Sequence, residues 1–255
     1  MDDPLRIRYE LEKAAHVARS GRPGPVLLDI PMDVQRADVD PDALAPFLGS
    51  PEHREGAENP APSPGDVEET VRQLLAAERP VLLAGGGVRL SGGTGELARV
   101  ADRSGAPVAV TLMGLDAIPH DHPAFRGMVG AYGNRYSNLA VANADFLLIV
   151  GTRLDTRITG TRPDSFARGA RIVHVDVDPN ELGQKIRTAR CVRADAKAFL
   201  SALADALPDP AKERGAWKTR IERWRMKYPT TPPSPAAGSL DPNRFVRILS
   251  EGASD

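Results

Sequence analysis

Short apolar runs alternate with amphipathic or glycine-rich segments through the middle of the chain. The runs lie at residues 80–85, 106–112, 145–151 and 171–178. A shorter run at 190–195 fits an edge strand. Buried strands that alternate with helices are typical of a parallel sheet covered on both faces. The pattern therefore predicts an α/β fold, with a doubly wound and mostly parallel sheet, over residues 66–207.

Helical spacing marks the segments expected to cover this sheet. Ser63 and Pro64 form an N-cap and first-turn pair, and apolar residues then recur with the helical period. Beyond the last strand, a basic helix places Trp217, Trp224 and Tyr228 on one face. Aromatic residues at this spacing serve more often for packing than for stacking on nucleic acid. We interpret this segment as a docking helix.

Both ends of the chain have the pattern of incomplete units. Residues 5–20 predict a helix and residues 25–31 an apolar strand, which together make half of a βα layer. A segment rich in Pro, Ala and acidic residues follows, as is typical of a linker. We therefore expect an incomplete unit, a linker, the α/β domain, a docking helix with a second linker, and the start of a further unit, at 1–34, 35–65, 66–207, 208–240 and 241–255.

Charge and cysteine content limit the partners and the compartment. The 33 basic and 34 acidic residues give a net charge of -1, so nothing attracts the chain as a whole to nucleic acid or to an anionic membrane. No apolar run approaches the roughly 20 residues of a membrane span, and the N-terminal residues lack the build of a secretory signal. Cys191 is the only cysteine, which fits a reducing compartment. We expect a cytoplasmic protein with no nucleic-acid or membrane partner.

Charged residues gather directly after the apolar run at 145–151. Gly151 ends this run, and Arg153, Asp155 and Arg157 follow within six residues. Ligands of parallel sheets bind at the carboxyl ends of the strands, and arginine suits bidentate recognition of phosphate. The alternative is an exposed charge cluster that contributes little. The position after a buried strand favours a phosphate contact.

Glycine-rich loops follow two of the predicted elements. Gly85–Gly87 come directly after the run at 80–84, and a second glycine-spaced loop spans Gly127 to Asn134 ahead of a helix. Glycine allows backbone N–H groups to approach a diphosphate closely. The spacing is not that of the dinucleotide-binding fingerprint, and glycines at strand ends also serve tight turns. Both interpretations stay open on the sequence alone.

Acidic residues end the run at 171–178. Asp178, Pro179 and Glu181 match the N-cap, N1 and N3 positions of a helix, so we predict that Asp178 is a cap. Asp176 has no such assignment. It either accepts hydrogen bonds from the sugar hydroxyls of a nucleotide, as acidic residues do in other dinucleotide sites, or faces water in a turn.

Four long motifs occur in order along the chain: GRPGPVLLDIPMDVQ at 21–35, RPVLLAGGGV at 79–88, the segment from TLMGLDAIP to TRITG at 111–160, and IVHVDVDPNELGQ at 172–184. Together they resemble thiamine-diphosphate-dependent enzymes of the acetolactate (acetohydroxyacid) synthase type. The resemblance covers most of residues 5–200. It implies that residues 66–207 form the Rossmann-like central domain of such an enzyme.

The resemblance also implies that two other domains are represented only in part. Residues 1–34 would be the end of the domain that binds the aminopyrimidine, and residues 241–255 the start of the domain that binds diphosphate and metal. The activating glutamate and the GDG-through-N metal signature of the family have no counterpart here, so we expect no catalytic residue and no metal ligand. An intact parent, a transferase or lyase, would use thiamine diphosphate and magnesium to decarboxylate a 2-oxo acid such as pyruvate and carboligate it. This chain alone is expected to be inactive, with the missing domains or a second copy as partners.

Some synthases of this family hold FAD, largely as a structural group, in the central domain. By motif, the FAD-facing positions here would be Gly85, Gly86, Gly87, Thr111, Leu112, Gly130, Ala131, Tyr132, Gly133, Gly151, Arg153, Asp155, Arg157, Asp176 and Val177. The sequence departs from the family at two of these loops, with GAYG in place of GMHG and RLDTR in place of RFDDR. Relatives without flavin keep the fold, so FAD is one candidate among nucleotide cofactors. The alternative to an enzyme fragment is a free-standing nucleotide-binding scaffold or regulatory module.

Overall fold

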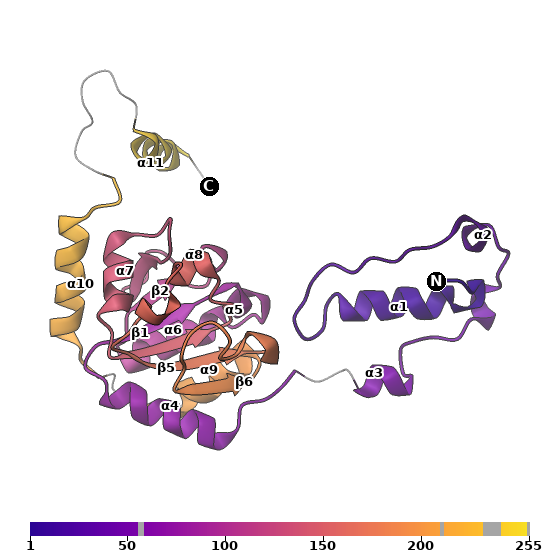
Figure 1. The fold of residues 1–255 in the computed structure, drawn as a ribbon, viewed down its shortest axis with the longest axis horizontal. Helices are drawn as coiled ribbons and strands as arrows, with labels where there is room; N and C mark the ends of the chain where they lie inside the picture. The colour runs from indigo at the N-terminus through magenta and orange to yellow at the C-terminus, as the bar shows by residue number, and fades with distance from the viewer. Residues whose placement is uncertain (56–58, 210–211, 232–240, 254–255) are drawn as a thin grey trace.

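A six-stranded sheet lies at the centre of the α/β part of the protein (Figure 1). The computed structural model describes residues 1–55, 59–209, 212–231 and 241–253. The strand order is β3-β2-β1-β4-β5-β6, and every neighbouring pair is parallel. The strands are β1 Pro80–Ala84, β2 Val108–Val110, β3 Phe125–Met128, β4 Phe146–Val150, β5 Arg171–Asp176 and β6 Arg190–Arg193. The predicted α/β fold with a doubly wound parallel sheet is confirmed.

The four inner strands, β2, β1, β4 and β5, lie within the apolar runs from which strands were predicted. Every residue of β1 and of β4 is buried, because helices cover both faces of the sheet. The run at 190–195 forms β6 at the edge, as predicted. Strand β3 lies at the other edge and was not predicted. Arg126 and Gly127 interrupt its apolar pattern, and an edge strand does not require full burial.

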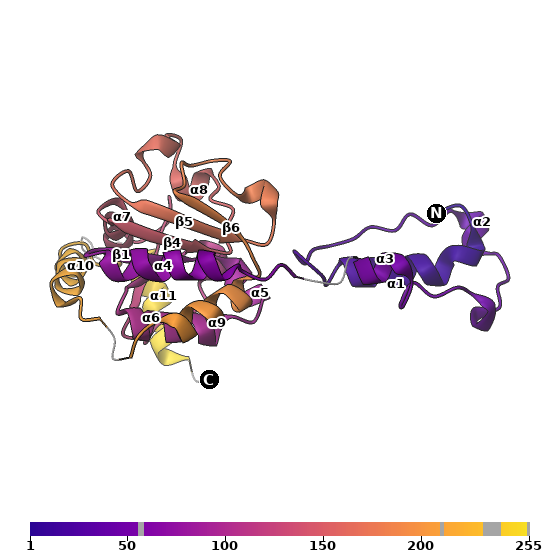
Figure 2. The same ribbon diagram turned by 90° about the horizontal axis from the view of Figure 1, so that it is seen from below.

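Helices form one layer on each face of the sheet (Figure 2). On one face, side chains of α4 Pro64–Ala76, α6 Thr94–Ser104 and α9 Ala196–Ala206 share an apolar core with alternate residues of the strands. On the other face, α7 Arg135–Ala142 and α10 Gly215–Lys227 pack over the remaining strand residues. Helix α10 contacts α7 and buries Trp217, so the predicted docking helix does pack against the domain.

The N-terminal part extends away from the sheet (Figures 1 and 2). It contains η1 Pro4–Arg6, α1 Ile7–Val17, α2 Met32–Gln35, η2 Pro41–Ala43 and α3 Pro51–Glu55. The strand predicted at 25–31 is wrong for this structure, since no residue of that segment belongs to a strand. A strand needs a neighbour for its backbone N–H and C=O groups, and none pairs with it among the described residues. Leu27 is 92% exposed as a result.

The segment expected to be a linker folds back on α1. Phe47 is buried, and its ring packs edge-on against Tyr9 with 5.3 Å between ring centroids. His16 and His53 complete this aromatic cluster. Most of the second predicted linker, at 232–240, lies outside the described residues.

Two short helices flank the strand ends that concern the site, and one helix follows the second linker. They are α5 Gly86–Leu90 after β1, α8 Thr156–Thr159 after β4, and α11 Pro242–Gly252. Helix α11 lies in the segment that we expected to be the start of a further unit, residues 241–255. Within the described ranges, no helix has the length and apolar character needed to cross a membrane.

Candidate functional site: a cavity at the carboxyl ends of the strands

A cavity of about 610 Å³ opens where the parallel strands end. Its walls come from the loops after the strands, from Gly86 after β1 round to Asp195 after β6. Strands β2 and β3 lie on one side of β1, whereas β5 and β6 lie beyond β4, so the winding of the chain reverses between β1 and β4. Ligands of open α/β sheets bind in the crevice at such a reversal. The volume is in the range typical of cofactor sites.

Most of the positions predicted to face a cofactor line this cavity. They are Gly86, Gly87, Thr111, Leu112, Ala131, Tyr132, Gly151, Arg153, Asp155, Arg157, Asp176 and Val177. Gly85, Gly130 and Gly133 do not line it. The loops that carry all of these residues come together at one end of the sheet, as the parallel arrangement requires. Contact of these residues with a nucleotide stays a prediction.

The glycines after β1 are required by the close approach of two loops. A Cβ atom added to Gly87 would lie 2.7 Å from the Cα atom of Gly151, and the converse distance is also 2.7 Å. In the same place, the N–H of Gly87 donates to the carbonyl oxygen of Gly151 at 2.9 Å. Of the two interpretations left open by the sequence, the structure supports the tight backbone packing directly. These glycines bring the loop after β4 against α5 and so shape the floor of the cavity.

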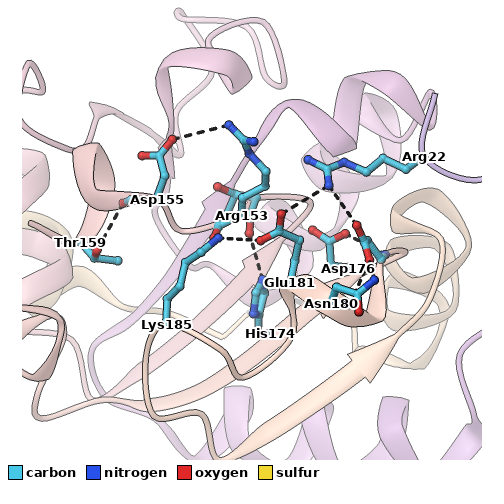
Figure 3. Close-up of polar contacts among 11 residues, drawn as sticks. Arg22, Arg153, Asp155, Thr159, His174, Asp176, Asn180, Glu181 and Lys185 are labelled. Carbon is cyan, nitrogen blue, oxygen red and sulfur yellow. Dashed lines mark hydrogen bonds and ion pairs between the residues drawn. The ribbon is translucent and has the colours of Figure 1, made fainter. Parts of the chain in front are cut away.

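Arginines outnumber carboxylates in the cavity lining, and two of them, Arg22 and Arg89, are paired with acidic residues outside it. Five arginines line it against three carboxylates; the arginines are Arg19, Arg22, Arg89, Arg153 and Arg157, and the carboxylates are Asp155, Asp176 and Asp195. Arg153 lies 3.9 Å from Asp155, which is too long for a good hydrogen bond (Figure 3). Asp155 instead caps α8 by accepting from the N–H of Arg157 at 3.0 Å. Arg153 and Arg157 therefore keep guanidinium N–H donors available for an anion.

Arg22 reaches the cavity from the N-terminal part, and sequence reasoning missed it. The segment after α1 contributes Arg19, Gly21, Arg22 and Pro23 to the lining. Arg22 donates to Asp178 at 3.0 Å and lies 3.4 Å from Glu181 (Figure 3). The GRPG turn predicts only the end of a helix, because the pattern gives no indication of which distant loop it meets.

Asp176 has a local role as well as a place in the cavity. It is 8% exposed, and its Oδ1 accepts from the N–H of Asp178 at 3.0 Å. The sequence assigns it no such turn bond. Burial raises the pKa of the Asp176 carboxyl, since few contacts compensate its charge. It contributes an acceptor to the cavity wall beside the guanidinium groups.

The predicted cap at Asp178 is confirmed, although the helix is shorter than expected. Asp178 accepts from the N–H of Asn180 at 2.9 Å at the start of η5 Pro179–Glu181, a single 3-10 turn. This hydrogen bond, together with the side chains of Arg22 and Asn180, lowers the pKa of the Asp178 carboxyl. Asp178 is thus charged at neutral pH and available to pair with Arg22.

Apolar side chains surround the mouth of the cavity. Leu90, Leu112, Met113 and Tyr132 all line it and are all exposed. Guanidinium donors, an acceptor at the end of β5 and an apolar rim together suit a ligand with phosphate, sugar hydroxyls and a flat ring. Among the described residues, no three His, Cys, Asp or Glu side chains are grouped to hold a metal.

Comparisons with known proteins agree with this architecture. Residues 67–203 match the family described as "Thiamine pyrophosphate enzyme, central domain". The probable acetolactate synthase 2, chloroplastic, of Oryza sativa subsp. japonica is 38% identical over 90% of this chain and 34% of its own length. The probable acetolactate synthase large subunit of Methanocaldococcus jannaschii is 36% identical over 97% of this chain and 42% of its own. The glyoxylate carboligase of Escherichia coli O157:H7 is 38% identical over 79% of this chain and 33% of its own.

The chain spans about a third to two-fifths of the length of these relatives. The matched central domain contains all six strands of the sheet and the loops that form most of the cavity. The chain belongs to the thiamine-diphosphate-dependent, acetolactate synthase-like enzymes and contains their central domain.

Proposed function

We propose that the cavity of this central domain binds an extended nucleotide, with FAD as the first candidate. The proposal depends mainly on one observation. Gly86, Arg153 and Asp176 line the same cavity, at the point where the winding of the sheet reverses. These residues come from the ends of three different strands. Their convergence is the arrangement by which open α/β sheets hold dinucleotides.

Each part of such a ligand has a counterpart in the wall. Arg153 and Arg157 would bind the diphosphate through charge-assisted hydrogen bonds. Asp176 would accept hydrogen bonds from sugar hydroxyls, for which its buried carboxylate is suited. Leu112 and Tyr132 at the exposed rim would lie against a flat ring. The role proposed for the bound nucleotide is structural, as the family resemblance implies.

For the whole protein we propose decarboxylation of a 2-oxo acid such as pyruvate, followed by carboligation. The names of the relatives, acetolactate synthase and glyoxylate carboligase, support this chemistry. Thiamine diphosphate with magnesium would supply it in domains that this chain represents only in part. The chain alone is expected to be inactive, and its proposed partners are those domains or a second copy. The single cysteine favours a reducing compartment such as the cytoplasm.

A binding measurement on the purified chain tests the nucleotide site. We expect flavin absorbance, or the mass of a nucleotide, in material released from the protein, and saturable binding of added FAD by calorimetry. Arg153→Met should weaken that binding by about tenfold or more, the loss of a charge-assisted hydrogen bond. Arg168→Met is the matched control, because Arg168 is exposed and lies before β5, at the opposite end of the strands.

The ligand arms of the experiment separate the candidates. Binding of ADP as tightly as FAD would identify an adenine nucleotide site without a requirement for the flavin ring. No binding of FAD or ADP at high micromolar concentration would overturn the proposed site. Equal effects of the Arg153 and Arg168 substitutions would show that the nucleotide binds elsewhere.

A further inference from the structure

Two successive carbonyl oxygens of the loop after β4 are held by side chains from other elements (Figure 3). The carbonyl oxygen of Thr152 lies 3.0 Å from Nε2 of His174, which is in β5. The carbonyl oxygen of Arg153 accepts from Nζ of Lys185 at 2.7 Å. Side chains from outside the loop therefore hold the backbone at Arg153, next to the cavity, through hydrogen bonds.

This loop follows a backbone path that needs such support. Leu154 has a φ of 54°, in the left-handed region that residues with a side chain rarely occupy. Its side chain is buried in the apolar core on the side of α7 and α10. Conformations of this kind persist only where surrounding contacts determine them. The contacts at Thr152 and Arg153 immediately precede the strained residue.

His174 is an unusual residue for its position. It is 1% exposed in the middle of a strand, between Val173 and Val175, and pairs in register with Ile149 of β4. Burial of an imidazole in such a place is costly unless it makes a hydrogen bond. Its Nδ1 atom is buried and has no hydrogen-bond partner among the described residues, so the bond from Nε2 to Thr152 is the contact that offsets the cost of burying the ring.

The geometry also assigns the protonation of the ring. A carbonyl oxygen can only accept, so Nε2 carries the proton and donates it to Thr152. Burial lowers the pKa of His174, which favours the neutral ring at neutral pH. Nδ1 is then an unprotonated nitrogen in an apolar setting. The residue lies behind the cavity wall and does not line the cavity.

We propose that His174 is a positioning residue of the nucleotide site: through Thr152 it fixes the loop that presents Arg153 and Asp155 to the cavity. The effect on ligand affinity rests on the proposed function of the cavity. The effect on the loop does not, because it is a property of the protein without ligand. The two can therefore be measured separately.

The experiment compares His174→Leu with His174→Gln in the full chain. Leu fills the space without a donor, whereas the Gln amide nitrogen can reach the place of Nε2. Hydrogen exchange by mass spectrometry should show roughly tenfold faster exchange in the peptide 151–158 of the Leu variant, the scale for a buried acceptor left unsatisfied. FAD affinity should fall by a similar factor, and Gln should restore most of both.

Val192→Ala in β6 is the control for a general loss of core packing, since Val192 is buried and belongs to the core on the opposite face. It should lower the unfolding midpoint and leave exchange in the peptide 151–158 near that of the wild type. If the Leu variant does not fold, Asn replaces it, because its amide is too short to reach Thr152 and should behave as Leu would.

Unchanged loop exchange in the Leu variant, or the same behaviour of the Gln and Asn variants, would overturn the positioning role. A wild-type chain that binds neither FAD nor ADP would refute the proposed function. In that case, loop exchange that is fast in Leu and slow in Gln would still support the role of His174 in holding the loop.

Discussion

Arg22 donates a 3.0 Å hydrogen bond to the carboxylate of Asp178, which is 156 residues away in the sequence. The same guanidinium lies 3.4 Å from Glu181. These contacts join the segment after α1 to the turn after β5, beside the cavity (Figure 3). Arg22 and Asp178 are both partly exposed, and ion pairs of that kind contribute little to global stability. Their effect should be local to the N-terminal segment.

Arg22→Met should therefore release the segment at residues 18–31 and leave the α/β part almost unchanged. We expect faster cleavage of this segment by thermolysin, with the free energy of unfolding lowered by no more than about 0.5 kcal/mol. Arg36→Met, a change of an exposed arginine in the same N-terminal part, is the control. A clearly lower unfolding midpoint in urea, for Arg22→Met alone, would show that the contact supports the whole fold.

Asp176→Asn should stabilise the protein while it weakens the site. The amide keeps an acceptor for the N–H of Asp178 and removes a charge that burial disfavours. At pH 7 we expect the free energy of unfolding to rise by about 1 kcal/mol, a typical size for one substitution. FAD affinity should fall, because an amide oxygen is a weaker acceptor than a carboxylate. Urea unfolding and calorimetry measure the two effects on the same sample.

Linkage determines the pH range of this gain. The pKa of Asp176 is higher in the folded than in the unfolded state, so its contribution to stability is complete below the unfolded value, about 3.9, and is lost as pH rises through the folded value. The Asn variant lacks that loss. The difference in the free energy of unfolding between the Asn variant and the wild type should be absent in acid and grow toward neutral pH. Asp164→Asn, at an exposed carboxylate, should show no such trend; an advantage that grows on acidification would contradict the assignment.

The sheet could be predicted because the buried strands are marked by their own residues. Strands such as β4 are continuous apolar runs, which helices on both faces require. Strand β3 could not be found in this way, since Arg126 and Gly127 are tolerated at an edge. The strand expected at 25–31 failed for the opposite reason. Its residues have the strand pattern, but a pattern does not supply the neighbour that a strand needs.

The site was predictable to the extent that it depends on strand ends. Residues that follow parallel strands meet at one edge of the sheet, so the positions of Arg153 and Asp176 in the sequence are enough to expect them on one cavity. Arg22 could not be predicted, because its place depends on a contact between distant segments. The hydrogen bond from His174 to Thr152 could not be predicted either, since the sequence does not show which loop a buried polar side chain contacts.

Arg214→Met should destabilise the α/β part strongly. The guanidinium is buried and donates to backbone carbonyl oxygens at the ends of α4 and α6: those of Leu74 and Ser104, at 2.7 and 2.9 Å, and that of Ala77. Met fills the space without a donor and leaves these acceptors unsatisfied, for a loss of about 3 kcal/mol in the free energy of unfolding. Arg223→Met, at an exposed residue of α10, is the control and should lower the free energy of unfolding by less than about 0.5 kcal/mol. Equal losses in urea unfolding would contradict this role.

Trp217 joins α10 to the start of β1 through a hydrogen bond. Helix α10 lies beyond residues 67–203, which match the central-domain family. Its ring is 3% exposed, and Nε1 donates to the carbonyl oxygen of Pro80 at 3.0 Å. Trp217→Phe should lower the free energy of unfolding by about 1–2 kcal/mol through the lost hydrogen bond, and Trp217→Ala by about 3–5 kcal/mol through the cavity that it leaves.

Trp224→Phe is the control for this pair, because the Trp224 ring packs edge-on against Trp217, is less buried, and donates to no backbone carbonyl among the described residues. A chain truncated after Arg214 keeps the buried guanidinium, lacks both rings and should unfold at a lower urea concentration than one truncated after Thr231. The helix covers one face of the sheet, so its loss exposes the core side of β1 and β4 to water. Equal midpoints for the two truncated chains would mean that the domain ends where the family match ends, and that α10 packs on it without stabilising it.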